Sequence, residues 1–183
     1  RAGTTVDGDV LRGKALDPRA TAYAVAEVVR AMETPRCAAL FVMAEECAMD
    51  IARKAVAYLA VGAPSLRLIV NADVPGIRNL GEGRLDTPAI RIFEGRNFID
   101  PAFGIQVADA MARKGVQFHL TGARSGSQTS LFAPMAPTLS IALPSSDMHL
   151  PAVNMSLIGI ERCIALMHSI GRAALAKESP FNQ

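Results

Sequence analysis

The sequence has few side chains suited to stacking on nucleic-acid bases. It contains no tryptophan, and aromatic residues make up only 5% of its 183 residues. The 19 basic and 17 acidic residues are interspersed, which gives a formal net charge of +2 and no basic stripe. A nucleic-acid surface needs clustered positive charge, often combined with stacking rings. We therefore expect no nucleic-acid partner.

Long hydrophobic runs and cysteine motifs are also missing. Charged residues interrupt every apolar segment well before the roughly 18 residues that a membrane span needs, as Glu161 and Arg162 do in the last predicted helix. The three cysteines, Cys37, Cys47 and Cys163, form no motif and leave an odd thiol, which favours a reducing compartment. Since no signal peptide opens the sequence, we expect a cytoplasmic protein with no membrane partner.

Apolar runs typical of strands alternate with segments of helical periodicity. Half of the residues are hydrophobic and 20% are charged, as in a well-buried globular chain. The expected strands cover 10–16, 41–44, 66–72, 88–93, 116–120 and 137–143, and the expected helices cover 22–32, 51–59, 101–114 and 156–176. This order predicts one α/β domain over residues 1–183, with a mainly parallel sheet flanked by helices on both faces. Only turn residues precede Val10, so we expect the sheet to be incomplete at its amino end.

Three of the expected strands end on carboxylates, and a fourth leads to a histidine. The residues are Asp17, Glu45, Glu46, Asp73 and His149. Ligands of α/β sheets bind outside the carboxyl ends of the strands, where these side chains would converge. Carboxylates gathered in a small volume repel one another unless a cation neutralises them. Carboxylates with a histidine suit Zn²⁺, Mn²⁺ or Co²⁺, so the pattern predicts a divalent metal site.

Each residue taken alone also has an interpretation without chemistry. Asp17 before Pro18 is a good helix N-cap. Glu45 and Glu46 suit a solvated strand end, Asp73 suits a turn, and His149 suits a surface loop. Only their joint placement favours a metal site.

Several segments, in this order, resemble the tetrahedral-aminopeptidase family of dinuclear metallopeptidases, relatives of glutamyl aminopeptidase. The matching segments are Val10–Ala20, Phe41–Glu46, Asn71–Asp73 with Pro75 and Gly76, Pro88–Arg91, and Leu143–Pro151. They resemble the family's bridging-aspartate turn, its paired glutamates, its "A-x-D-V…P-G" and "G-P-A-I" segments, and its final histidine loop. The order and approximate spacing hold over nearly the whole chain.

The resemblance implies a role for each residue at the expected site. Asp17 would bridge two divalent ions, with zinc expected and cobalt or manganese as alternatives. Glu46 and His149 would bind one ion, Asp73 would bind the other, and Glu45 would be the general base. The implied function is a metal-dependent aminopeptidase or related amidohydrolase that cleaves a peptide or small amide with a metal-activated water.

The sequence also departs from that family. The family's remaining histidine ligand, and the lid domain that mediates its assembly, precede the segment equivalent to Val10, so this chain resembles the carboxyl-terminal catalytic part. We expect a homo-oligomer, or a partner chain that supplies the missing segment. Pro18, Gln128, Leu150 and Val153 replace family residues around the site. Because groups behind the ligands orient them, these changes support a second hypothesis: a catalytically inactive homologue that serves as a binding or assembly subunit.

Overall fold

The structure is a computed structural model. It describes residues 3–42, 49–63, 65–80, 84–94, 97–98, 100–123, 126–176 and 179. Within them, no helix is long and apolar enough to cross a membrane.

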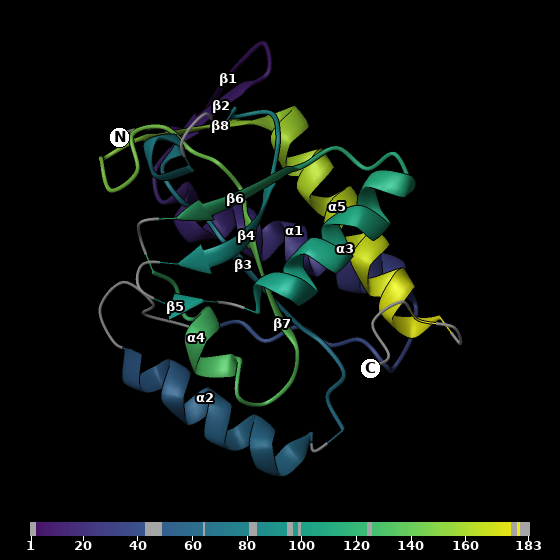
Figure 1. Cartoon of the computed structure of the whole chain (residues 1–183). Helices are drawn as coiled ribbons and strands as arrows, with labels where there is room; N and C mark the ends of the chain where they lie inside the picture. Colours follow the sequence, from purple (N-terminus) through teal and green to yellow (C-terminus); the bar gives the residue numbers. More distant parts are fainter. Residues whose placement is uncertain are drawn as a thin grey trace.

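The larger sheet has strand order β3-β7-β4-β5, with β6 also paired to β4 (Figure 1). Its strands are β3 (Ile69–Asp73), β4 (Ala89–Glu94), β5 (Asn97–Phe98), β6 (His119–Ala123) and β7 (Thr138–Ala142). The parallel β3–β7 and β4–β6 ladders are longer than the antiparallel β4–β7 and β4–β5 ladders. The predicted α/β class with a mainly parallel sheet is therefore confirmed.

Three long helices cover one face of this sheet. They are α1 (Leu16–Met32), α3 (Pro101–Arg113) and α5 (Leu157–Leu175). Their buried residues join Ile90 of β4 and Leu139 and Ile141 of β7 in one hydrophobic core. Side chains alternate along a strand, so the neighbouring Arg91 and Ser140 face the opposite side. That side carries the short helix α4 (Thr129–Phe132), against which α2 (Met49–Gly62) packs.

A second, three-stranded antiparallel sheet lies beside the first. It has the order β1-β2-β8, formed by β1 (Thr5–Asp7), β2 (Val10–Gly13) and β8 (Val153–Ser156). The sequence predicted one strand over 10–16 in the main sheet, which is wrong. The strand ends at Gly13 and pairs in a hairpin whose turn contains Gly8 at φ 56°, a conformation that suits glycine.

Two further strand predictions need correction. Phe41 and Val42, the described part of the expected strand 41–44, lie in no strand, and Phe41 is 55% exposed. The strand expected at 116–120 begins instead at His119, so Gly122 lies within β6 rather than in a loop. The ring of Phe93 occupies the space where a side chain at Gly122 would stand, which explains a glycine inside a strand.

Candidate active site

Asp17 lies at the junction of β2 and α1. After β2 ends at Gly13, Ala15 takes a left-handed conformation with φ 53°, which turns the chain into the helix. Asp17 itself has φ −88° and ψ 118°, so regular helical geometry begins only after Pro18. The hydroxyl of Thr21 donates to the Pro18 carbonyl at 2.8 Å and holds this first turn. The backbone thereby places Asp17 at the N-terminus of α1.

Backbone hydrogen bonds tie the segment after β3 to the segment after β7. The Leu143 amide donates to the Asp73 carbonyl at 2.9 Å, and the Ser145 amide donates to the Pro75 carbonyl at 3.0 Å. The Ile77 amide donates back to the Ser145 carbonyl at 2.7 Å. The end of β3 and the loop that carries His149 therefore leave the sheet side by side.

The structure brings His149 to Asp17. His149 has a left-handed backbone with φ 65°, and its Nε2 lies 3.9 Å from Oδ2 of Asp17. The Asp17 side chain is 9% exposed and that of His149 is 62% exposed. Together with Lys14, Leu150 and Pro151, they line an open pocket of about 340 Å³. A carboxylate and an imidazole are thus presented to one solvent-accessible space.

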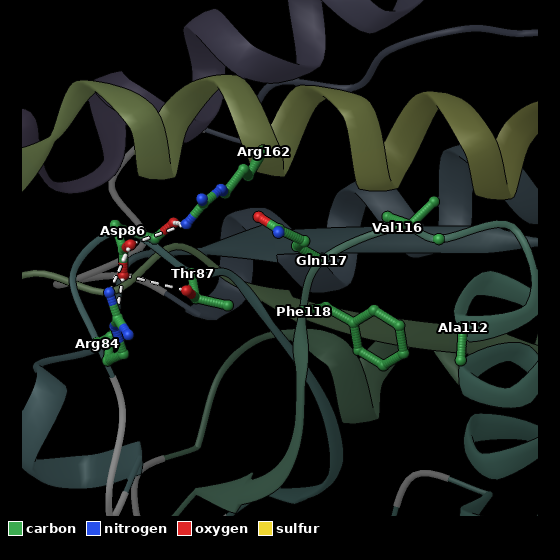
Figure 2. Close-up of a pocket in the computed structure, with 9 residues that line it drawn as sticks. Arg84, Asp86, Thr87, Ala112, Val116, Gln117, Phe118 and Arg162 are labelled. Atoms are coloured by element: carbon green, nitrogen blue, oxygen red, sulfur yellow. Dashed lines mark hydrogen bonds and ion pairs between the residues drawn. The ribbon is translucent and has the colours of Figure 1, made fainter.

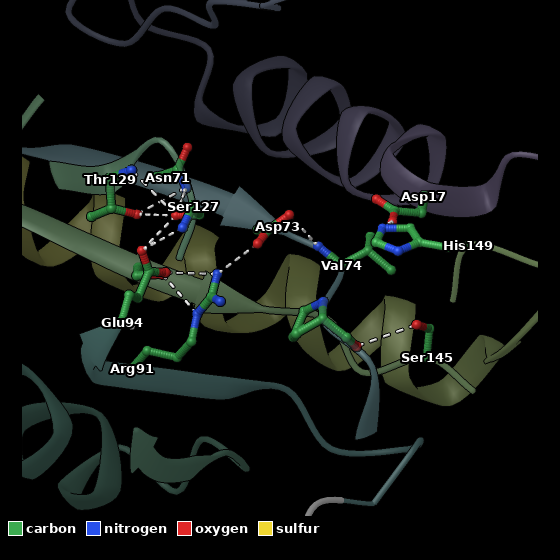
Figure 3. A network of polar contacts seen from close by, with 12 residues as sticks. Asp17, Asn71, Asp73, Val74, Arg91, Glu94, Ser127, Thr129, Ser145 and His149 are labelled. Atoms are coloured by element: carbon green, nitrogen blue, oxygen red, sulfur yellow. Dashed lines mark hydrogen bonds and ion pairs between the residues drawn. The ribbon is translucent and has the colours of Figure 1, made fainter. Parts of the chain in front are cut away.

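Asp73 ends β3, as predicted, but its carboxylate is already engaged. Oδ2 accepts from Nη2 of Arg91 at 3.0 Å, and Oδ1 accepts from the Val74 amide at 2.8 Å. Figure 3 shows Asp73 between this arginine and the Asp17–His149 pair. The Asp73 carboxylate is therefore held by Arg91 and by the backbone that follows β3.

The other two predicted site residues, Glu45 and Glu46, lie outside the described residues. Among the residues that are described, no group of three His, Cys, Asp or Glu side chains is arranged to hold a metal ion. The donor chemistry nevertheless fits: Asp17 and His149 are an oxygen and a nitrogen ligand of the kinds that zinc binds. The pair suits two positions of a coordination shell that needs further ligands.

Sequence reasoning missed a buried polar network on the sheet face opposite the core. Arg91 and Glu94 of β4 are 0% and 1% exposed, and Nη2 of Arg91 lies 2.9 Å from Oε1 of Glu94. Nε of Arg91 donates to the Ser140 hydroxyl at 2.8 Å, and the Ser127 hydroxyl donates to Oε2 of Glu94 at 2.6 Å. The signal in the sequence was a pair of opposite charges three residues apart in and just after an otherwise apolar run.

The residues that depart from the resembled family have different surroundings. Gln128 is 4% exposed just before α4, and its Nε2 has no hydrogen-bond partner in the described structure. Leu150 is 57% exposed at the mouth of the pocket, whereas Val153 is 2% exposed in β8. Of the four residues that depart from the family, Leu150 and Val153 line the same pocket as His149, and Pro18 and Gln128 do not.

A second pocket, of about 490 Å³, is lined by the loop before β4, the end of α3, the segment before β6 and Arg162 of α5 (Figure 2). Asp86 accepts from Arg84 at 3.0 Å, from Thr87 at 3.1 Å and from Arg162 at 2.8 Å. Partial burial would raise the pKa of Asp86, but these hydrogen bonds outweigh it and lower the pKa. This arrangement fastens the loop to α5 and contains none of the predicted site residues.

The described cysteines do not suit nucleophilic chemistry. Cys163 is fully buried in α5, and burial raises the pKa of its thiol to about 12. Partial burial also raises the pKa of Cys37. Because the thiolate is the reactive form, both groups remain protonated and weakly reactive near neutral pH.

The same fold occurs in solved peptidases. No protein-family model and no curated protein sequence matches the chain. The dodecameric PhTET1-12s superposes with a TM-score of 0.80 and 16% identity over 93% of this chain and 53% of that chain. The TET1 peptidase of Pyrococcus horikoshii superposes with a TM-score of 0.76 and 16% identity, over 92% of this chain and 52% of that chain. The TET aminopeptidase of a marine-sediment archaeon of the Thaumarchaeota superposes with a TM-score of 0.76 and 18% identity, over 99% of this chain and 55% of that chain.

Because the sequence identities are low, the similarity to these structures shows the fold alone. The chain spans about half the length of the structures that it matches. The chain therefore has the α/β fold of the TET peptidases and related aminopeptidases.

Proposed function

We propose that this chain is the catalytic part of a metal-dependent aminopeptidase or related amidohydrolase. The observation that carries the proposal is the approach of Asp17 and His149, 3.9 Å apart, at an open pocket of an aminopeptidase fold. Asp17, Glu46, Asp73 and His149 would hold two divalent ions. When bound, these ions would supply Lewis acidity to a water and to a peptide or amide carbonyl.

The proposed chemistry of the chain itself centres on Glu45. We assign it the transfer of a proton from the attacking water to the nitrogen of the leaving amine, since a general base near the water can later serve as the acid. Asp17 is nearly buried and holds its position from the α1 entrance, while His149 remains accessible to solvent. The buried ligand would fix the ions, and the exposed side would admit the substrate.

The proposal extends to assembly. The TET1 peptidase of Pyrococcus horikoshii can assemble into a tetrahedron or a large octahedral shell. On α2 of the present chain, Tyr58 and Val61 are 75% and 86% exposed, which favours contact with another protein surface. We propose that the chain works as a homo-oligomer, or with a partner chain that contributes further ligands.

The experiment is a comparison of Glu45→Gln with Glu161→Gln, which neutralises an exposed glutamate of α5. Release of amine from a panel of aminoacyl p-nitroanilides is measured after addition of Zn²⁺, Co²⁺ or Mn²⁺. We expect Glu45→Gln to lose about 10²- to 10⁴-fold in kcat with its metal content unchanged, because Glu45 is assigned to proton transfer and not to ligation.

Glu161→Gln should retain the activity of the unaltered chain. If the metal-loaded chain shows no turnover on any substrate, or if Glu45→Gln is as active as the unaltered chain, the catalytic proposal is wrong. The inactive binding or assembly subunit is then the better description.

A further inference from the structure

Arg91 connects the predicted metal ligand Asp73 to the buried polar network. Its Nη2 lies 3.0 Å from Oδ2 of Asp73 and 2.9 Å from Oε1 of Glu94. The guanidinium lies between these two carboxylates, so the positive end of the Arg91–Glu94 pair faces Asp73 (Figure 3). Arginine cannot lose its proton in a protein, so this charge is permanent.

The ion pair has two opposing consequences for a cation at Asp73. The guanidinium holds the Asp73 carboxylate in place, which favours cation binding. Its positive charge also draws electron density from Oδ2 and repels the cation, and both effects disfavour binding. The Val74 amide holds Oδ1 at 2.8 Å independently of Arg91. Because this second contact already orients the carboxylate, the charge effect should exceed the orienting effect. The Arg91 side chain is 0% exposed, so water screens its charge weakly.

The buried network also leaves one hydrogen-bond donor of Arg91 without a partner among the described residues. Its Nη1 is buried and has no hydrogen-bond partner among the described residues. An unpaired buried donor lowers stability, and an apolar residue in the same place would avoid that cost. This favours a role for the charge of Arg91 beyond packing.

We propose that Arg91 is a positioning residue that acts through Asp73 and lowers the affinity of the divalent-cation position to which Asp73 contributes. The other position, to which His149 contributes and which Arg91 does not contact in the described structure, keeps its full affinity. The inference rests on the proposed function, because that function makes Asp73 a ligand. It identifies Arg91 and Glu94 as the residues that make the two positions differ in cation affinity.

The test is calorimetric titration of the chelator-stripped full chain with Co²⁺. In the double variant Arg91→Met with Glu94→Gln, both buried charges are removed, and the weaker binding step should become about tenfold tighter. In Glu94→Gln alone, Arg91 is left to pair with Asp73 only, and the weaker step should become about tenfold weaker. The stronger step should stay unchanged in both variants.

A matched control is Arg84→Gln, which removes an arginine that also pairs with an aspartate, Asp86, in a separate pocket. It should leave both steps unchanged. Removing one partner of a buried ion pair leaves an uncompensated charge, whereas removing both does not, so the double variant alone decides if Glu94→Gln does not fold. Two binding steps that neither variant shifts, or that both variants weaken, would overturn the role of Arg91 and leave the proposed function standing. No Co²⁺ binding by the unaltered chain would instead overturn the proposed function itself.

Discussion

At the scale of single residues, Gly159 shows how closely α5 approaches the loop before β4. A Cβ on Gly159 would stand 2.3 Å from the carbonyl oxygen of Leu85, a backbone atom that cannot move without the loop. Gly159→Ala should therefore lower the free energy of unfolding by about 2 kcal/mol, measured by urea denaturation.

Gly171 in the same helix provides the matched control. A Cβ there meets only the flexible end of Met32, at 3.3 Å, and alanine is the better helix former. Gly171→Ala should be neutral or stabilising. Equal destabilisation by both substitutions would contradict the close approach at Gly159.

The residues of the candidate site were only partly predictable from the sequence. Asp17, Asp73 and His149 stood next to segments whose apolar pattern marked them as strands, and the structure brings Asp17 and His149 together. The pairing of Arg91 with Asp73 was not predictable, because the sequence pattern shows which residues share a strand face but not which strands are neighbours. The neighbourhood of Arg91 depends on β4, β7 and β3 lying side by side.

At the scale of elements, Asp86 fastens the loop before β4 to α5. Hydrogen bonds from Arg84, Thr87 and Arg162 lower its pKa below the ordinary value of 3.8. A carboxyl group with a lowered pKa in the folded state stabilises the protein fully above its ordinary pKa. That contribution is lost as the pH falls through the lowered folded-state pKa.

Asp86→Asn should therefore destabilise the chain at pH 7 by an amount that shrinks steadily at pH values below about 4. Thermal unfolding of the variant and the unaltered chain across this range measures the difference. A difference that stays constant down to pH 2 would show that the carboxylate charge of Asp86 is not what fastens the loop.

Apolar runs predicted three strands of the larger sheet, whereas the sheet predicted for β2 was wrong and the run that begins at Phe41 lies in no strand in its described part. The runs at 66–72, 88–93 and 137–143 became β3, β4 and β7. Strand β2 instead pairs with β1 and β8, one of them close in sequence and the other at the far end of the chain. No local pattern distinguishes a strand of the main sheet from a strand of this smaller one.

At the scale of the whole molecule, one sheet carries two different faces. The apolar face packs under α1, α3 and α5, and the opposite face carries the buried network of Arg91 and Glu94. Asp73 ends β3, and Arg91 of the polar face holds its carboxylate, on the side of Arg91 where Figure 3 shows Asp17 and His149. The candidate site thus draws its residues from the end of β3, the N-terminus of α1 and the loop before β8.

The most direct test of a divalent-metal site that includes His149 is the metal content per chain, determined by elemental analysis of protein purified without chelator. The same analysis is made for His149→Ala and for His168→Ala, a control in α5. We expect about two ions per chain, a clear fall in His149→Ala, and no change in His168→Ala. Chains that hold no metal, or that hold the same amount with and without His149, would contradict a metal site at this histidine.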